Sequence, residues 1–121
     1  MDSGYDLQVL KQLAVIRQRG ACSVLPEVDS AWAESTSGLL KALADPTRLT
    51  MVAAMWKAEV PICICDFTAS LDLSQPTISH HMGKLREVGL VESQKQGIWI
   101  YYRLKDVLPN STRRLLSQLL S

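Results

Sequence analysis

The three cysteines are the residues of this chain whose chemistry stands out. Cys63 and Cys65 are separated by one residue, and Cys22 lies much earlier in the sequence. In an extended segment a Cys-x-Cys spacing directs both sulfurs to one face, whereas in a helix they would point about 200° apart. The segment from Ile62 to Cys65 follows Pro61, so we expect it to be extended or a turn. The pair is therefore a candidate thiolate site for a soft metal or metalloid ion.

Two general properties of cysteine bear on this interpretation. An odd number of cysteines argues against a disulfide framework, and a single free cysteine is commonly just a buried apolar residue. The pair changes that balance because it sits at the N-terminus of a predicted helix, where the pKa of a thiol is usually lowered. Oxidation of Cys63 and Cys65 by a redox signal is an alternative use of the same two thiols.

The remaining residue types point away from catalysis. No Ser/His/Asp order, paired-carboxylate site or Gly-rich phosphate loop stands out, so we expect no enzyme. His80 and His81 are neighbours on a predicted helix and diverge by about 100°, so they cannot chelate one ion. We expect His80 to face outward and His81 to flank the core as a structural residue.

A helix is predicted from about Gln75 to Val88, and both of its ends are marked by the sequence. Ser74 is a good N-cap, Pro76 is tolerated in a first turn, and Gly89 suits the position after the last turn. One apolar stripe at i, i+4 and i+7 is expected to dock on a core. Its members are Ile78, Met82 and Leu85.

The opposite face of this helix is polar and nearly neutral. A helix face that is merely solvated more often carries Lys/Glu pairs at i, i+4. Here the face carries Ser, Thr, Gln, His and Lys, all of which can bond base edges or phosphates. We interpret the helix as a DNA recognition helix, with a solvated surface helix as the alternative.

The charge distribution supports a nucleic-acid partner. The net charge of the chain is only +1. Residues 1–73 contain 6 basic and 9 acidic residues, a net −3, whereas residues 74–105 contain 5 basic and 2 acidic residues, a net +3. The positive field is therefore concentrated on the predicted recognition helix and on the segment that follows it.

The elements before this helix are predicted to be helical. An amphipathic helix is expected from Asp6 to Arg19, ended by Gly20, and a connector from Ala21 to Val28 holds Cys22. A second helix capped by Asp29 or Ser30 should run to Ala44. A third should run from Pro46 to about Lys57, with Leu49, Val52 and Trp56 inward. A short helix from Asp66 to Leu71, with Asp66 as its cap, and a turn over residues 71–74 complete a helix-turn-helix.

After Gly89 the hydrophobic period changes from 3.6 to 2. Residues 90–95 and 98–104 are predicted strands, and Gln96-Gly97 is the predicted turn of a hairpin, or wing. A last helix, capped by Ser111 or Thr112, carries a dense apolar edge made of Leu115, Leu116, Leu119 and Leu120. The predicted DNA-contacting residues are Ser74, Gln75, Thr77, Ser79, His80, Lys84, Arg86, Lys95, Gln96 and Arg103.

Length and composition fit one domain. We expect residues 1–121 to form a single winged helix-turn-helix domain that is mainly α with a β-hairpin wing. No apolar run is long enough for a membrane helix, and the acidic N-terminus lacks a signal-peptide pattern, so a cytoplasmic protein without a membrane partner is predicted. Because so small a domain has little interior to cover the apolar faces of its first and last helices, these are expected to form a homodimer interface, with packing on their own domain as the alternative.

Three segments together resemble the ArsR/SmtB family of winged-helix, metal-responsive transcriptional repressors. They are L-L-K-A-L-A-D-P-T-R-L, L-S-Q-P-T-I-S-H-H-M-G-K-L-R-E-V-G-L-V and G-I-W-I-Y-Y-R-L, which lie between Leu39 and Leu104. The resemblance implies a homodimer that binds a palindromic DNA operator and leaves it when a toxic metal or metalloid binds. The C-x-C-D segment resembles the metalloid-binding box of the family. Some relatives have a third cysteine shortly after the pair, where Phe67 and Thr68 stand here.

Cys22 is the remaining thiol, and it lies where a subgroup of arsenic-responsive relatives has N-terminal cysteines. The resemblance thus implies a three-sulfur site of Cys22, Cys63 and Cys65 if the N-terminal arm, the part of the chain before about Ala31, folds over the cysteine pair. Three thiolates without a fourth ligand suit trivalent arsenic or antimony, or trigonal Cd or Pb, better than tetrahedral Zn. Relatives that sense zinc or nickel commonly use carboxylate and His ligands on the last helix, and this chain has no His after His81.

The sequence therefore predicts a DNA-binding repressor with no permanent cofactor, released by As(III) or Sb(III). A Cd-, Pb- or Zn-responsive repressor and a cysteine-redox-sensing repressor are the alternatives. A DNA-binding module whose thiols are buried and silent is a third.

Overall fold

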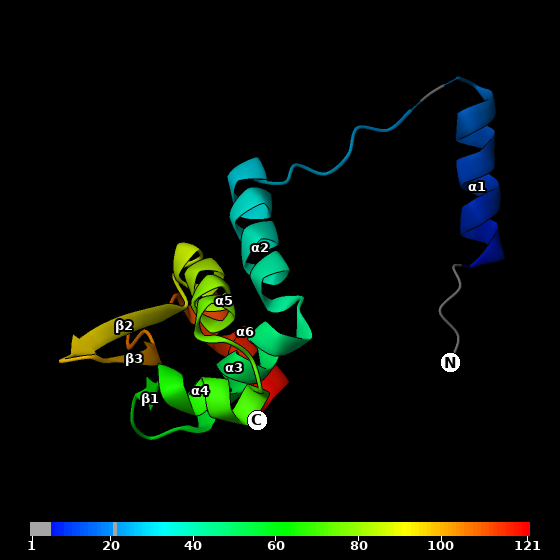
Figure 1. Cartoon of the computed structure of the whole chain (residues 1–121). Coiled ribbons are helices and arrows are strands. Elements are labelled where there is room, and N and C mark those ends of the chain that lie inside the picture. Colours follow the sequence, from blue (N-terminus) through cyan, green and yellow to red (C-terminus); the bar gives the residue numbers. More distant parts are fainter. Residues whose placement is uncertain (1–5, 21) are drawn as a thin grey trace.

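Six helices and a three-stranded antiparallel sheet follow one another in the computed structural model, which describes residues 6–20 and 22–121. Residues 1–5, which belong to the N-terminus that was predicted to lack a signal peptide, lie outside the described residues. Ala21 of the predicted connector does so as well. The elements are α1 (Leu7–Gln18), α2 (Ser30–Leu43), α3 (Pro46–Lys57), β1 (Ile62–Cys63), α4 (Ile64–Leu71), α5 (Gln75–Glu87), β2 (Val91–Gln96), β3 (Trp99–Leu104) and α6 (Asn110–Leu120) (Figure 1). The predicted mainly α fold with a β-hairpin wing is confirmed.

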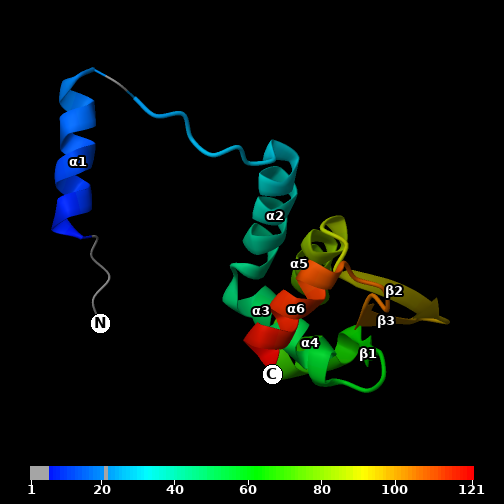
Figure 2. The same cartoon turned by 180° about the vertical axis from the view of Figure 1, so that it is seen from behind.

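The helix α1 stands apart from the other elements in both views of the molecule (Figures 1 and 2). Its start is fixed locally, because the Asp6 carboxylate accepts a hydrogen bond from the Gln8 backbone N–H at 2.9 Å. Every residue of α1 and of the extended connector 22–29 is exposed. The helix is thus formed by local signals without any buried face.

The helices α2 and α3 begin at the predicted caps. The Asp29 carboxylate accepts from Ala31 N–H at 3.0 Å, and the Asp45 carboxylate accepts from Arg48 N–H at 2.9 Å. The predicted inward face of α3 was partly wrong, since Leu49 is 39% exposed. Val52 is 0% exposed as predicted, and Met51 and Met55 fill the core beside it. Trp56 is half-buried at the edge of this face.

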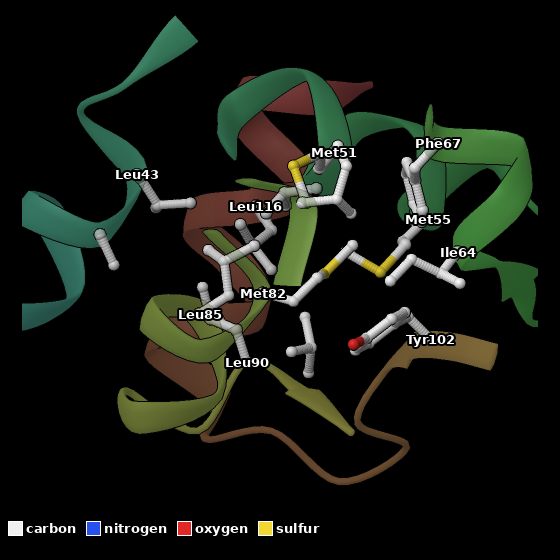
Figure 3. Packing of buried hydrophobic residues seen from close by; sticks show 14 of the residues in the cluster. Leu43, Met51, Met55, Ile64, Phe67, Met82, Leu85, Leu90, Tyr102 and Leu116 are labelled. Carbon is white, nitrogen blue, oxygen red and sulfur yellow. The ribbon is translucent and has the colours of Figure 1, made fainter. Parts of the chain in front are cut away.

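The core is built from the C-terminal end of α2 and from the elements that follow it, α3 to α6 (Figure 3). The predicted stripe of α5 is confirmed, because Ile78, Met82 and Leu85 are all 0% exposed. Leu116 of α6 is also 0% exposed and packs in this core, so its predicted place at an interface between subunits was wrong. Leu119, by contrast, remains 57% exposed. The inner face of α6 packs in the core of its own domain, and its outer edge is left exposed for a partner.

The sheet has the order β1-β3-β2. Ile62 pairs with Tyr102, and on the other side of β3 the hairpin register pairs Gln96 with Trp99. The turn is therefore Gly97-Ile98 rather than the predicted Gln96-Gly97, and Gly97 takes the positive φ of 62° that this two-residue turn requires. The shift by one residue moves Gln96 from the turn to the end of the strand.

The end of the chain departs from prediction at the start of α6. The N-cap is Pro109, which makes no side-chain cap hydrogen bond, and neither predicted cap residue occupies that position. Ser111 and Thr112 lie inside the helix, and Thr112 is only 9% exposed. Within residues 6–20 and 22–121, no helix has the length and the apolar character needed to cross a bilayer.

Candidate thiolate site and nucleic-acid interface

The thiols of Cys63 and Cys65 lie together where the sheet ends and the helix-turn-helix begins. Their sulfur atoms are 2.7 Å apart. Cys63 ends β1 and is the N-cap of α4, with its sulfur accepting the Cys65 N–H at 3.4 Å. The prediction that Asp66 caps this helix was wrong, because strand pairing ends at Cys63 and the helix begins directly after it. Both thiols nevertheless point to the same place.

The electrostatics of the pair differ from the prediction. The pKa of Cys65 is raised above its ordinary value, chiefly by the hydrogen bond to the Cys63 sulfur and further by burial and by the nearby charges of Cys63 and Asp66. A helix N-terminus favours a thiolate, but here the neighbouring thiol and the Asp66 carboxylate, 4.0 Å from the Cys65 sulfur, oppose a second negative charge. The raised pKa favours the protonated form of Cys65, so a cation or a covalent partner has to displace that proton.

Cys22 is not brought to the pair. It lies in the exposed connector, which leads away from α4 in both views (Figures 1 and 2). Among the residues that the structure describes, no three side chains of His, Cys, Asp or Glu are grouped so as to hold a metal ion. The predicted three-sulfur site therefore stays a prediction that requires the arm to move.

The helices α4 and α5 form the helix-turn-helix, with a left-handed Asp72 (φ 53°) at the end of α4. Ser74 caps α5 as predicted: its hydroxyl accepts the Thr77 N–H at 3.3 Å and lies 2.9 Å from the Thr77 hydroxyl. Because these two hydroxyls serve the cap, they are fixed in position at the start of the helix. Four other predicted DNA-contacting residues of α5 are exposed. They are Gln75, Ser79, His80 and Lys84.

The hairpin β2–β3 projects beside α5. Arg86, the last predicted contact residue of α5, donates to the Ser93 hydroxyl of β2 at 2.6 Å, which ties the helix to the hairpin. Lys95 and Gln96 are exposed close to the tip. Arg103 lies further from the tip and is paired with the carboxylates of Glu92 at 2.7 Å and Asp106 at 3.2 Å. Its positive charge is thereby largely neutralised within the protein.

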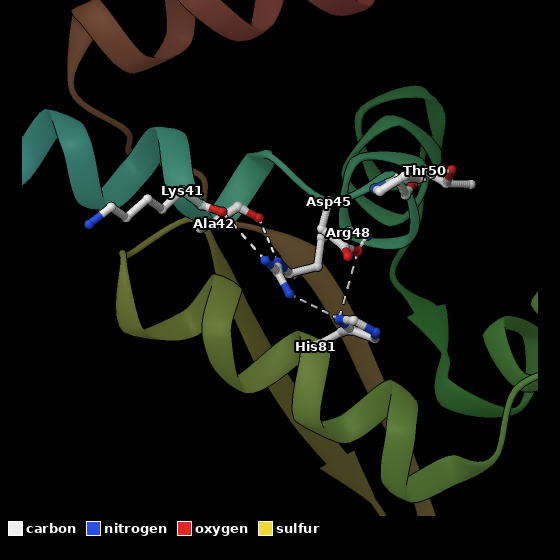
Figure 4. A network of polar contacts seen from close by, with 7 residues as sticks. Lys41, Ala42, Asp45, Arg48, Thr50 and His81 are labelled. Carbon is white, nitrogen blue, oxygen red and sulfur yellow. Dashed lines mark hydrogen bonds and ion pairs between the residues drawn. The ribbon is translucent and has the colours of Figure 1, made fainter.

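A polar network behind α5 was only partly predicted (Figure 4). His81 is 16% exposed, in keeping with the structural role expected for it, and its Nδ1 lies 3.2 Å from Arg48 Nη1. Asp45 is the N-cap of α3, and its pKa is lowered, mainly by the hydrogen bond from the Arg48 backbone N–H and also by the charge of Arg48. No role was predicted for Arg48. The D-P-T-R segment was the available signal, since it places this arginine in the first turn of a capped helix.

Comparison with known proteins agrees with this geometry. The sequence pattern described as "Bacterial regulatory protein, arsR family" matches residues 45–93. The arsenical resistance operon repressor of Escherichia coli (strain K12) is 41% identical over 80 residues, which cover 66% of this chain and 68% of the repressor. The chain belongs to the ArsR family of bacterial regulatory proteins. It is accordingly a DNA-binding transcriptional repressor of the winged helix-turn-helix type and not an enzyme.

Two further similar proteins bear on the identity of the effector. The cadmium resistance transcriptional regulatory protein CadC of Listeria innocua is 40% identical over 73 residues, which cover 60% of each chain. The crystal structure of NolR from Sinorhizobium fredii has a TM-score of 0.65 and 26% identity, covering 81% of this chain and 93% of NolR. Arsenic and cadmium thus both occur in the names of similar ArsR-family proteins, and neither name identifies the effector here.

Proposed function

We propose that this ArsR-family repressor binds a trivalent arsenic or antimony ion through Cys63 and Cys65 and thereby leaves its DNA operator. The observation that supports the proposal is the 2.7 Å separation of the two sulfurs at the first turn of α4. A single soft ion can take both sulfurs as ligands. Cadmium and lead remain possible ions for the same donor set.

The number of thiols decides which form of arsenic binds. Two sulfurs satisfy a trivalent arsenic that already carries one organic group, whereas inorganic arsenite offers three positions. Cys22 is the third thiol of the chain, and its exposure on the connector gives it freedom to approach. We therefore expect Cys22 to strengthen inorganic arsenite binding without being indispensable. The approach could come from the same subunit or from a second one.

The coupling to DNA follows from the position of the pair. Cys63 is paired with Tyr101 in the sheet, and Cys65 is already part of α4, the first helix of the helix-turn-helix. An ion that fixes both sulfurs must alter the junction between β1 and α4, and with it the seat of α5. By linkage, the ion weakens DNA binding only as far as it prefers the altered state, typically by about 1–3 kcal/mol or about 5- to 150-fold.

The test of this proposal uses serine variants. Cys63→Ser and Cys65→Ser should leave operator binding intact and remove release by arsenite, measured by fluorescence anisotropy of a labelled operator. Cys22→Ser is the matched control, and it should weaken the response to arsenite less than either other change. Release that persists in a Cys63→Ser/Cys65→Ser double variant would exclude the pair, and release by zinc alone would exclude this class of effector.

DNA reading is proposed for the exposed face of α5 and for the tip of the hairpin. We propose that the exposed side chains of Gln75, Ser79 and His80 read base edges and that those of Lys84 and Lys95 bind phosphate. Lys84→Ala should reduce the slope of log affinity against log salt by about one and weaken all sequences alike. Lys11→Ala on α1 is a charge-matched control that should leave the slope unchanged. An unchanged slope for Lys84→Ala would remove this lysine from the interface.

A homodimer on a palindromic operator is proposed from the uncovered apolar residues. These gather on α1, on α2 and at the outer edge of α6, and they include Leu7, Leu10, Leu13, Ile16, Trp32, Leu40 and Leu119. One recognition helix for each chain requires a twin to read two half-sites about one DNA turn apart. Leu119→Glu should raise the dimer dissociation constant in sedimentation and weaken operator binding. Leu116→Glu is not a suitable test, because it would place a charge in the core.

A cysteine-redox repressor is the second candidate, and the same sulfur separation favours it. Oxidation would join the two sulfurs, with two electrons and two protons passing to a peroxide that is reduced. Treatment with peroxide followed by mass spectrometry should then show a loss of two hydrogens that a thiol reductant restores. Operator release by peroxide without any metalloid would favour this candidate over the first.

A further inference from the structure

Arg48 joins three helices at one point behind the recognition helix (Figure 4). It lies in the first turn of α3. Its Nε donates to the carbonyl of Ala42 at 2.6 Å, and its Nη2 donates to the carbonyl of Lys41 at 3.4 Å. Its Nη1 lies 3.2 Å from Nδ1 of His81, in the middle of α5. One guanidinium thus connects the C-terminal turn of α2 to the helix that we propose reads DNA.

The chemistry of these contacts fixes the state of His81. Arginine has five N–H donors and no acceptor, and it stays protonated in proteins. A hydrogen bond from Nη1 therefore requires a lone pair on Nδ1 of His81, so the ring must be neutral with its proton on Nε2. The carboxylate of Asp45, 4.0 Å from the same Nδ1, is too distant to compete as a hydrogen-bond partner in this arrangement.

The Ala42 carbonyl lies in the last turn of α2, where the helix itself supplies no N–H partner for the final carbonyls. The Lys41 carbonyl already accepts the Ala44 N–H at 3.3 Å, and Arg48 Nη2 adds a second donor to it. Nε and Nη2 of Arg48 donate to these two carbonyls, while Nη1 contacts His81 of α5. Lysine could not do the same, because an ammonium lacks the planar fork that reaches both sides at once.

His81 is well placed to set the reading face. It directly follows Ser79 and His80, which are exposed on the outer side of α5, and it precedes Met82, which is 0% exposed in the core. The apolar stripe fixes the distance of α5 from the core. The Arg48–His81 contact adds a directional restraint on the rotation of α5 about its own axis.

We propose that Arg48, acting through neutral His81, is a positioning residue for DNA recognition: it sets the orientation of α5 against α2 and so the aim of the base-reading side chains. This inference rests on the proposed reading of DNA by α5. Neither residue is proposed to touch DNA. Their loss should therefore reduce the preference for the operator sequence and leave the general attraction to phosphate unchanged.

The experiment uses a DNA duplex that the wild-type protein has selected from a random library, with a random duplex of equal length as the comparison. Arg48→Lys keeps the charge and removes the fork, and it should lower affinity for the selected duplex about tenfold with no change on the random duplex. Arg113→Lys is the matched control, since Arg113 also donates to a backbone carbonyl, that of Asp106, at 2.8 Å. It should change neither affinity.

Rescue at the other end separates positioning from simple loss of stability. His81→Gln keeps an acceptor for Arg48 and should stay within about threefold of the wild type, whereas His81→Leu should lose about as much as Arg48→Lys. The two losses should not add in the double variant Arg48→Lys/His81→Leu. In ¹⁵N spectra of the wild-type protein, His81 should show an unprotonated Nδ1 and a protonated Nε2.

The outcomes separate the recognition of DNA by α5 from the role of Arg48. A wild-type protein that selects no DNA sequence overturns recognition by α5 and with it the role of Arg48. A wild-type protein that selects a sequence, together with an Arg48→Lys variant of unchanged affinity, overturns only the role of Arg48. A protonated Nδ1 on His81, or equal losses for His81→Gln and His81→Leu, overturns it as well.

Discussion

The helices α1 and α5 are built from nearly the same local signals and end in different states. They have 12 and 13 residues, each begins at a side-chain cap, and each is followed by a glycine with φ 78°. Yet α5 buries Ile78, Met82 and Leu85 completely, and α1 buries no residue. Caps and apolar periodicity thus define a helix, but only a complementary surface makes it part of a core. The exposed leucines of α1 call for such a surface outside the described chain.

The largest expected effect contrasts a leucine from each helix. Leu85→Ala should lower the free energy of unfolding by about 2–5 kcal/mol, because it leaves a cavity among residues that cannot collapse to fill it. Leu13→Ala on α1 should change the unfolding free energy of the monomer by less than about 0.5 kcal/mol. Urea denaturation at low protein concentration measures both. Equal losses would mean that α1 packs on its own domain.

An intermediate effect contrasts the thiols of the two regions. The raised pKa of Cys65 means that its proton must be displaced when Cd²⁺ binds, so Cd²⁺ affinity should rise as pH rises toward that pKa, by about tenfold per pH unit for each proton released. Arsenous acid removes the thiol protons as water, so its affinity should depend little on pH in the neutral range. Calorimetric titrations of the Cys22→Ser variant in two buffers isolate the pair.

A flat pH profile for Cd²⁺ in that variant would contradict the raised pKa of Cys65. The same titration of the Cys63→Ser/Cys65→Ser double variant reports on Cys22 alone. It shows whether the connector contributes any affinity of its own.

The smallest expected effect contrasts the two glycines that follow these helices. A Cβ at Gly89 or at Gly20 meets nothing within 4 Å, so the cost of alanine is confined to the left-handed backbone. Gly89→Ala should lower the unfolding free energy by about 1 kcal/mol, whereas Gly20→Ala should only fray α1. Circular dichroism with urea separates the two. A global loss for Gly20→Ala would show that α1 unfolds together with the domain.

These contrasts explain what the sequence could and could not predict. Helix starts at Asp29, Asp45 and Ser74 were predictable because a cap is a bond between residues two or three apart. The start of α4 was not, since Cys63 becomes its cap only after strand pairing with β3 has ended. The close sulfurs were predicted from an extended backbone, and they are close through a cap geometry instead.

Burial was harder to predict than helix boundaries. Leu116 and Leu119 are equally apolar, and only the position of the core decides that one is buried and the other exposed. The direction of the Cys65 pKa shift was missed for a related reason, because a helix N-terminus acts over the first turn while a neighbouring sulfur acts at contact distance. The role of Arg48 depends on carbonyls six and seven residues earlier and on a ring 33 residues later, which no local pattern specifies.

The 2.6 Å hydrogen bond between Arg86 and Ser93 has a consequence for the DNA itself. Together with the short connection of residues 88–90, it holds β2 against the end of α5. In the proposed complex, a duplex whose grooves are spaced differently has to bend or twist to fit, and the energy of that deformation depends on the base steps between the contacts. Part of the operator preference would then come from base pairs that no side chain touches.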